Sequence, residues 1–126
     1  MKVKTSELID AALDLAVALA RDESVRVERG IVRFALSQFT NDYDLYAPST
    51  DWSQGGPIID REIGNLWKHN KLDPNEPDVW TAAAYRKAPD GTMLYYEDGP
   101  TPLIAAMRCY VASKLGDEID IPKELT

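Results

Sequence analysis

The sequence predicts an α+β fold, in which a small antiparallel sheet carries about three helices packed mainly on one face. Two patterns predict it. Apolar residues recur at helical spacing near both ends of the chain, and apolar and polar residues alternate as in strands in residues 25–36 and around residues 79–97. The length of 126 residues matches one domain with one core, so we expect residues 1–126 to form a single globular domain.

A first helix is expected from Thr5 or Ser6, either of which could cap it, to about Arg21. Its apolar side would be a stripe of leucine and alanine: Leu8, Ala12, Leu15 and Leu19. Asp10 and Asp14 fall toward the opposite side. This spacing favours a solvated acidic face over paired carboxylates arranged for acid–base catalysis. Two charges within the apolar stretch also argue against a secretory signal sequence.

The middle of the chain predicts a hairpin, a loop and a second helix. Residues 25–36 hold β-branched residues around Arg29-Gly30, which favours a hairpin, with continuation of the first helix as the alternative. Residues 40–57 mix turn-forming and aromatic residues and indicate an ordered surface loop. Pro57 suits the first position of a helix that runs toward Leu66 and Trp67.

A second hairpin is expected after a connection at residues 68–78, where two prolines stand among charges. Its strands would be residues 79–85 and 93–97, joined by a turn at Pro89-Asp90-Gly91. The alanine run Ala82-Ala83-Ala84 indicates that a helix packs close to the first of these strands.

The last helix has the clearest signals. Thr101 can cap it, Pro102 fits its first turn, and Gly116 ends it. Because the Thr101 hydroxyl can accept from the exposed N–H groups, we expect this helix start to satisfy its own donors.

The start of the second helix offers a candidate ligand site at Gly55-Gly56-Pro57. If Pro57 opens the helix, Gly56 is the cap and has no side-chain acceptor, which leaves N–H groups for Asp51, Ser53 or an anion. Trp52 would lie beside them. We favour a rigid turn with Trp52 folded over the edge of the core; a ligand pocket that also uses Arg108 is the alternative.

Aromatic residues cluster in the same loops, and loop aromatics serve either as interface anchors or as anchors of a small core. Tyr43, Tyr46 and Trp52 lie in the first loop, and Tyr95 and Tyr96 precede the second. The candidate binding surface comprises residues of both loops and their flanks: Tyr43, Tyr46, Asp51, Trp52, Ser53, Gln54, Gly55, Gly56, Asp98, Gly99, Thr101 and Arg108.

Composition restricts the function classes. Lys and Arg number 14 against 21 Asp and Glu, and the net charge of −7 disfavours nucleic acid and anionic membranes as partners. Cys109 and His69 are the single cysteine and histidine, so the chain cannot form a structural zinc site alone, and we expect no metal, cofactor or catalytic residue. A Cys109–His69 nucleophile is possible, but core packing is favoured for Cys109. No apolar run approaches the roughly 20 residues that span a bilayer, and we expect a cytoplasmic protein.

Two segments resemble a known family: residues 46–59, YAPSTDWSQGGPII, and residues 99–110, GPTPLIAAMRCY. They are similar to the NinX-like proteins, small proteins encoded by tailed bacteriophages and prophages of enteric bacteria. Residues 8–20 and 113–118 also fit. The resemblance implies an origin, that of a phage accessory protein acting in the cytoplasm of the bacterial host. It carries no activity, cofactor or catalytic residue over to this chain.

These observations favour a non-catalytic module that binds a host or phage protein through residues 43–57 and 97–102. Two alternatives stand beside it. One is a small-ligand (anion) binder or enzyme that uses Gly55-Gly56-Pro57, and the other is a homo-oligomer formed by self-association.

Overall fold

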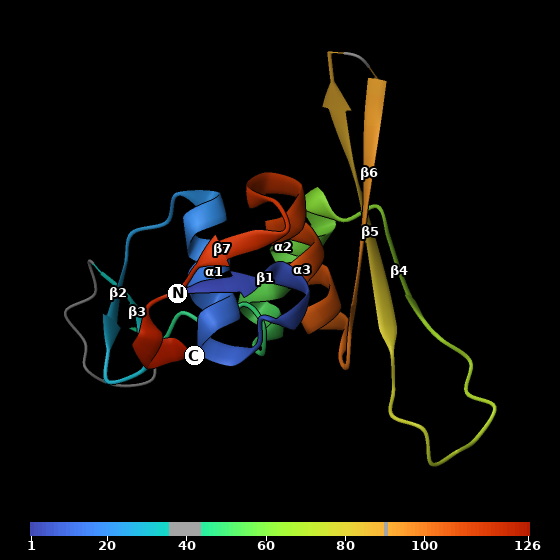
Figure 1. Cartoon of the computed structure of the whole chain (residues 1–126), viewed down its shortest axis with the longest axis horizontal. Coiled ribbons are helices and arrows are strands. Elements are labelled where there is room, and N and C mark those ends of the chain that lie inside the picture. The colour runs from blue at the N-terminus through green and yellow to red at the C-terminus, as the bar shows by residue number, and fades with distance from the viewer. Residues whose placement is uncertain (36–43, 90) are drawn as a thin grey trace.

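A computed structural model describes residues 1–35, 44–89 and 91–126 of the chain. It confirms the α+β class, with helices and several small antiparallel sheets (Figure 1). The elements, in chain order, are β1 (Lys2–Lys4), the 3-10 helix η1 (Thr5–Glu7), α1 (Asp10–Arg21), β2 (Val25–Glu28), β3 (Ile31–Phe34), α2 (Trp52–Glu62), β4 (Asn65–Lys68), β5 (Trp80–Ala88), β6 (Gly91–Gly99), α3 (Pro102–Leu115), β7 (Glu118–Asp120) and the 3-10 helix η3 (Lys123–Leu125).

Helix α3 lies at the centre of the fold and begins and ends as predicted. The Thr101 hydroxyl accepts a hydrogen bond from the N–H of Ile104 at 3.1 Å, and Gly116 ends the helix with a φ of +93°. Most of the helix is buried, because α1, α2 and the strands β5 and β6 all pack on it. No helix in the described residues is long and apolar enough to cross a membrane.

The sheet β4-β5-β6 covers one side of α3 and contains the second predicted hairpin. Strands β5 and β6 pair residue for residue from Trp80 opposite Gly99 to Ala88 opposite Gly91, so both strands are longer than expected. Asp90, in the predicted turn, lies outside the described residues. The alanines 82–84 are buried, which confirms that small residues mark the close approach of a helix. Figure 1 shows the tip of this hairpin extending past the helices.

The first helix was predicted to start too early. Helix α1 begins at Asp10, because residues 2–4 pair with β7 in antiparallel register, Lys2 opposite Asp120. Thr5 does not cap α1: its hydroxyl donates to the carbonyl of Gly116 at 2.6 Å. The buried and exposed faces predicted for this helix were also partly wrong. Leu19 is exposed and Asp14 is buried, since the loop before α2 covers the Asp14 side.

The first hairpin is confirmed as β2 and β3, with Val25 opposite Phe34 and positive φ at Arg29 and Gly30. Asp44, which follows the hairpin in the sequence, is fully buried, and its carboxylate forms ion pairs with Arg26 of β2 at 2.9 Å and with Arg33 of β3. Tyr43 belongs to the candidate surface but lies outside the described residues.

The second helix was predicted to start and end too late. Helix α2 begins at Trp52, capped by Asp51, and Pro57 lies inside it. The chain leaves the helix at Ile63, and residues 65–68 form strand β4 against β5, where a continuing helix was expected. The Asp51 cap sets the start of the helix, and the helix continues through Pro57 although a proline there removes one hydrogen bond and crowds the preceding turn. Residues 69–79 connect β4 to β5, whereas the sequence predicted a connection at residues 68–78 that follows the second helix.

Candidate functional site

The two loops singled out from the sequence meet at the starts of α2 and α3. Thr50 and Trp52 on one side and residues 101–104 on the other line a shallow hollow of about 210 Å³. Trp52 is the first residue of α2, and 55% of it is exposed. Thr50, Ser53 and Thr101 are exposed around it. A hollow between the loops was expected for a ligand pocket, but Asp51, Ser53 and Arg108, the polar groups expected to converge there, do not line it.

Asp51 satisfies the donors at the start of α2. Its carboxylate accepts from the N–H of Ser53 at 2.9 Å and from the Ser53 hydroxyl at 2.7 Å. These hydrogen bonds stabilise the charged form and hold the pKa of Asp51 below its ordinary value. Gly55 and Gly56 lie within the helix. The predicted open helix end at Gly55-Gly56-Pro57 is therefore wrong, because the helix starts five residues earlier than Pro57 and brings its own acceptor.

Gln54 and Gly55 fix the loop itself. The Gln54 side chain accepts from the N–H of Ala47 and donates to the carbonyl of Leu45, both at 2.9 Å. A Cβ on Gly55 would fall 2.5 Å from Leu103 Cδ2 and even closer to the carbonyl oxygen of Pro48. Only glycine fits at position 55, where the loop, α2 and α3 touch. Gln54 and Gly55 therefore support the candidate surface by fixing the loop under it.

Tyr46 belongs to the core. It is 4% exposed, and its ring packs edge-on against Phe34 with centroids 5.1 Å apart. No residue in the described part of the chain forms a hydrogen bond with its hydroxyl. Burial raises the pKa of Tyr46 above its ordinary value. An aromatic loop residue that could have anchored an interface instead anchors the loop.

Asp14 ties α1 to the same loop, a contact that the sequence did not indicate. The residue is 5% exposed, and its Oδ1 accepts from the N–H of Ser49 at 2.8 Å. Burial raises the pKa of Asp14 to about 6, although the hydrogen bond from Ser49 opposes this shift. Periodicity alone places Asp14 on a polar face and gives no sign that a loop 35 residues away covers it.

The second loop is fixed by Asp98, Gly99 and Arg108. Arg108 donates to the carbonyl of Asp98 at 2.9 Å and to that of Leu8 at 2.8 Å, so it joins β6 to the segment before α1. Gly99 is buried, and a Cβ there would fall 2.6 Å from the backbone nitrogen of Ala105. Asp98 accepts from the Thr81 hydroxyl at 2.5 Å. Neither Asp98 nor Arg108 lines the hollow beside Trp52.

The predicted core position of Cys109 is confirmed. Its thiol is buried and donates to the carbonyl of Tyr95 at 3.4 Å, and burial raises its pKa to about 12. His69 has a different partner, since its Nε2 lies 2.6 Å from the Thr81 hydroxyl. The two residues therefore form no nucleophile pair. Residues 1–35, 44–89 and 91–126 contain no group of three side chains that could hold a metal ion.

A second aromatic surface lies on the face of the sheet turned away from α3. Trp67 of β4 and Tyr96 of β6 contact each other edge to face, with ring centroids 6.4 Å apart. Tyr85 is exposed on the same face, and its hydroxyl accepts from Asn65 at 3.3 Å. Sequence reasoning missed Trp67 as a surface residue because it assigned residues 57–67 to a helix.

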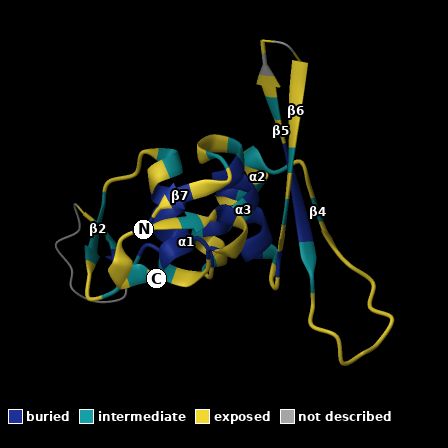
Figure 2. Ribbon diagram, viewed as in Figure 1, coloured by how far each residue is buried: buried dark blue, intermediate teal, exposed yellow. Residues whose placement is uncertain are grey.

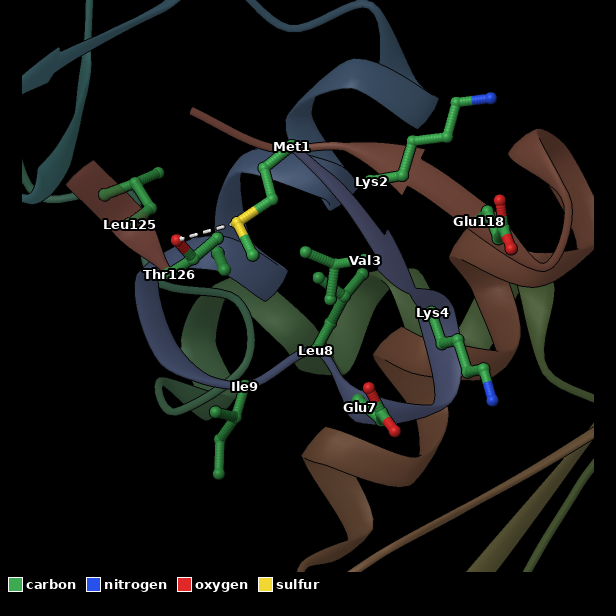
Figure 3. Close-up of a pocket in the computed structure, with 11 residues that line it drawn as sticks. Met1, Lys2, Val3, Lys4, Glu7, Leu8, Ile9, Glu118, Leu125 and Thr126 are labelled. Atoms are coloured by element: carbon green, nitrogen blue, oxygen red, sulfur yellow. Dashed lines mark hydrogen bonds between the residues drawn. The ribbon is translucent and has the colours of Figure 1, made fainter. Parts of the chain in front are cut away.

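A larger apolar hollow of about 550 Å³ lies between β1, the start of α1 and η3, away from both loops (Figure 3). Val3 and Leu8 point into it, and the Thr126 hydroxyl donates to Met1 Sδ at 3.6 Å along one side. Its lining includes two lysines and two glutamates, so no net charge selects a ligand.

The two segments that meet beside Trp52 are those that resemble phage proteins. A comparison with protein families shows to which family the chain belongs. The family model of NinX from bacteriophage P22 matches residues 4–114. The chain belongs to the NinX family. The NinX match includes both loops, α2 and all of α3 except its last residue, and it makes this a phage-associated protein. No curated protein matches the chain significantly.

Proposed function

We propose that this NinX-family protein is a non-catalytic binding module that engages a host or phage protein in the cytoplasm of the infected bacterium. Its contact site would be the Trp52 surface, defined as Thr50, Trp52, Ser53, Thr101 and Pro102. The observation that carries the proposal is the position of Trp52. A large aromatic side chain, 55% exposed, borders an apolar hollow where the two family segments meet.

The contacts beneath the Trp52 surface support this role because they make it rigid. Asp51 caps α2, Thr101 caps α3, and the close approach of Gly55 to Leu103 joins the two helix starts. A partner that covers Trp52 would gain the burial of an indole without ordering a flexible loop. Tryptophan is one of the residue types enriched among the few side chains that dominate the binding energy of a protein interface.

Charge supports a protein partner with a basic or neutral contact face. The net charge of −7 repels phosphate backbones, and it would favour encounter with a positively charged protein surface. The anion-binding alternative loses its structural premise, since Asp51 already occupies the donors at the start of α2. We therefore do not carry it forward.

The test is capture of partners from nuclease-treated bacterial lysate by the tagged protein, with Trp52→Ala as the test variant. Trp67→Ala is the matched control, because Trp67 is also an exposed tryptophan, 42% exposed, but lies on β4. Circular dichroism must first show that both variants fold. We expect a protein that is retained by the wild type and by Trp67→Ala and is lost with Trp52→Ala.

The captured protein is then purified and its Kd is measured directly. Loss of a central tryptophan should weaken binding by roughly 30-fold, equivalent to about 2 kcal/mol. Equal binding by Trp52→Ala and the wild type would rule out the Trp52 surface as the contact site.

A further inference from the structure

Strand β6 is an edge strand whose outer side has no strand partner in the described residues. It pairs with β5 along all nine residues, and the sheet order β4-β5-β6 leaves its other edge open. Figure 1 shows the hairpin tip extending past the helices, and Figure 2 shows this part of β6 as exposed. A long open edge presents a row of backbone donors and acceptors that can pair with another strand.

The open edge of β6 lacks the features that usually block such pairing. Residues 91–96, GTMLYY, contain no proline, no lysine and no other charge, and their one-to-one register with β5 leaves no bulge. The opposite edge of the sheet is protected. Strand β4 has only four residues and ends in Lys68, which forms an ion pair with Asp78 at 3.5 Å.

The side chains along β6 are apolar and exposed. Met93 is 50% exposed, Leu94 39% and Tyr96 56%. Residues of alternate parity point to opposite faces, so Leu94 and Tyr96 lie on the outer face with Trp67, and Met93 lies on the face of α3. A strand added to this edge would bury apolar side chains on both faces of the sheet.

The order of charges along the hairpin favours an antiparallel copy of the same strand. Glu97 and Asp98 lie at the base of β6, whereas residues 91–96 carry no charge. Antiparallel pairing centred within residues 92–96 brings the acidic base of each strand beside the uncharged part of the other. Parallel pairing would place like charges together.

We propose that β6 pairs antiparallel with β6 of a second copy, so that two three-stranded sheets join into one of six strands. The twofold axis stands perpendicular to the sheet within residues 92–96. The base of β6 is unavailable, because η1 packs beside it and Arg108 binds the Asp98 carbonyl there. The outer aromatic faces of the two copies then form one continuous surface. This dimer does not depend on the Trp52 surface.

The geometry of the pair gives a position-resolved test. On a twofold axis of this kind a residue lies opposite itself, with Cα atoms about 4.5–5.5 Å apart. That range matches the requirement of a disulfide. Each step away from the axis shifts the two copies of a residue roughly 7 Å apart along the strand direction, so their Cα atoms are already about 8 Å apart after one step. Single cysteines are placed at positions 92 to 96 in a Cys109→Ser background, and disulfide-linked dimer is measured after mild oxidation. Lys2→Cys, exposed on β1, is the control.

We expect one position, and at most its immediate neighbours, to cross-link at least tenfold more than Lys2→Cys. An even yield across the scan would overturn the proposal. In sedimentation equilibrium the wild type and Trp52→Ala should show the same concentration-dependent dimer. Tyr96→Lys should be monomeric, and Leu72→Lys, a substitution at a fully exposed loop residue, should dimerise. A wild type that stays monomeric at high concentration, or a dimer that survives Tyr96→Lys, would refute the β6 pairing.

Discussion

The carboxylate of Asp14 accepts a hydrogen bond from the backbone N–H of Ser49, and this bond joins helix α1 to the loop that leads into Trp52. The carboxylate is nearly inaccessible to water, and burial raises its pKa from the ordinary 3.8 to about 6. Because this buried carboxylate ionises near pH 6 and holds the loop before Trp52, the stability of the Trp52 surface depends on pH.

The first prediction concerns that pH dependence. Because the pKa of Asp14 is higher in the folded state than in the unfolded state, the folded protein binds the proton more tightly. The resulting stabilisation is complete below about pH 4 and is lost as the pH rises through 6. The two pKa values differ by the equivalent of roughly 3 kcal/mol. Asp14→Asn keeps the acceptor for Ser49 and cannot ionise.

Urea unfolding of the wild type and Asp14→Asn between pH 4 and pH 8 measures this effect. Asp14→Asn should gain stability relative to the wild type as the pH rises through 6. A difference between the two proteins that stays constant over this range would contradict the assignment.

The second prediction separates two adjacent glycines of α2. Gly55→Ala places a Cβ against the Pro48 carbonyl and Leu103, and the backbone atom cannot move aside, so we expect a loss of about 1–3 kcal/mol. Gly56→Ala has room, since the nearest atom is Trp52 Cε3 at 4.0 Å, and alanine should stabilise the helix by about 0.5–1 kcal/mol. Thermal unfolding of both variants measures the contrast. Equal effects would show that the loop and α3 are not in close contact.

The third prediction concerns Asp44, which is buried between Arg26 and Arg33. Asp44→Ala leaves two partly buried guanidinium groups without this carboxylate and should cost roughly 3 kcal/mol, at the low end for a broken buried ion pair, because both arginines reach solvent. Glu28→Ala removes an exposed partner of Arg26 and should cost less than about 1 kcal/mol. Denaturant titration compares them. A cost for Asp44→Ala no larger than that of the control would argue against its anchoring role.

The fourth prediction is that Cys109 does not react in the folded protein. Its thiol is buried and its pKa is raised to about 12, so at pH 7.5 it carries almost no thiolate. Labelling with a chromogenic disulfide reagent should follow the unfolded fraction as urea is added. Rapid labelling of the native protein would show that α3 opens locally.

Elements that depend on local signals were predictable from the sequence. Thr101 and Gly116 mark the two ends of α3, and Arg29-Gly30 marks the first hairpin turn, because caps and turns act over a few residues. The start of α1 was not predictable. Thr5 is a good capping residue, but its hydroxyl bonds to Gly116, 111 residues away, and only the paired strands β1 and β7 bring the two together.

The candidate surface was predictable in place but not in the roles of its residues. The sequence indicated both loops, and they do meet at Trp52. It could not separate Trp52, which is exposed, from Tyr46, which is buried, since both are aromatic loop residues. It also placed the helix start at Pro57, because a proline preference is readable in sequence, whereas the competing cap by Asp51 depends on loop geometry fixed by Gln54.

Strands β1 and β7 place the two ends of the chain side by side, and the terminal ammonium of Met1 bonds to the carbonyl of Ile121 at 3.2 Å (Figure 1). A short linker between the ends would turn this pair into a hairpin. The chain could then be reopened in the exposed connection at residues 69–79, between β4 and β5. Such a circular permutant would keep every sheet and move the free ends to the far side of the protein, leaving β6 and Trp52 intact.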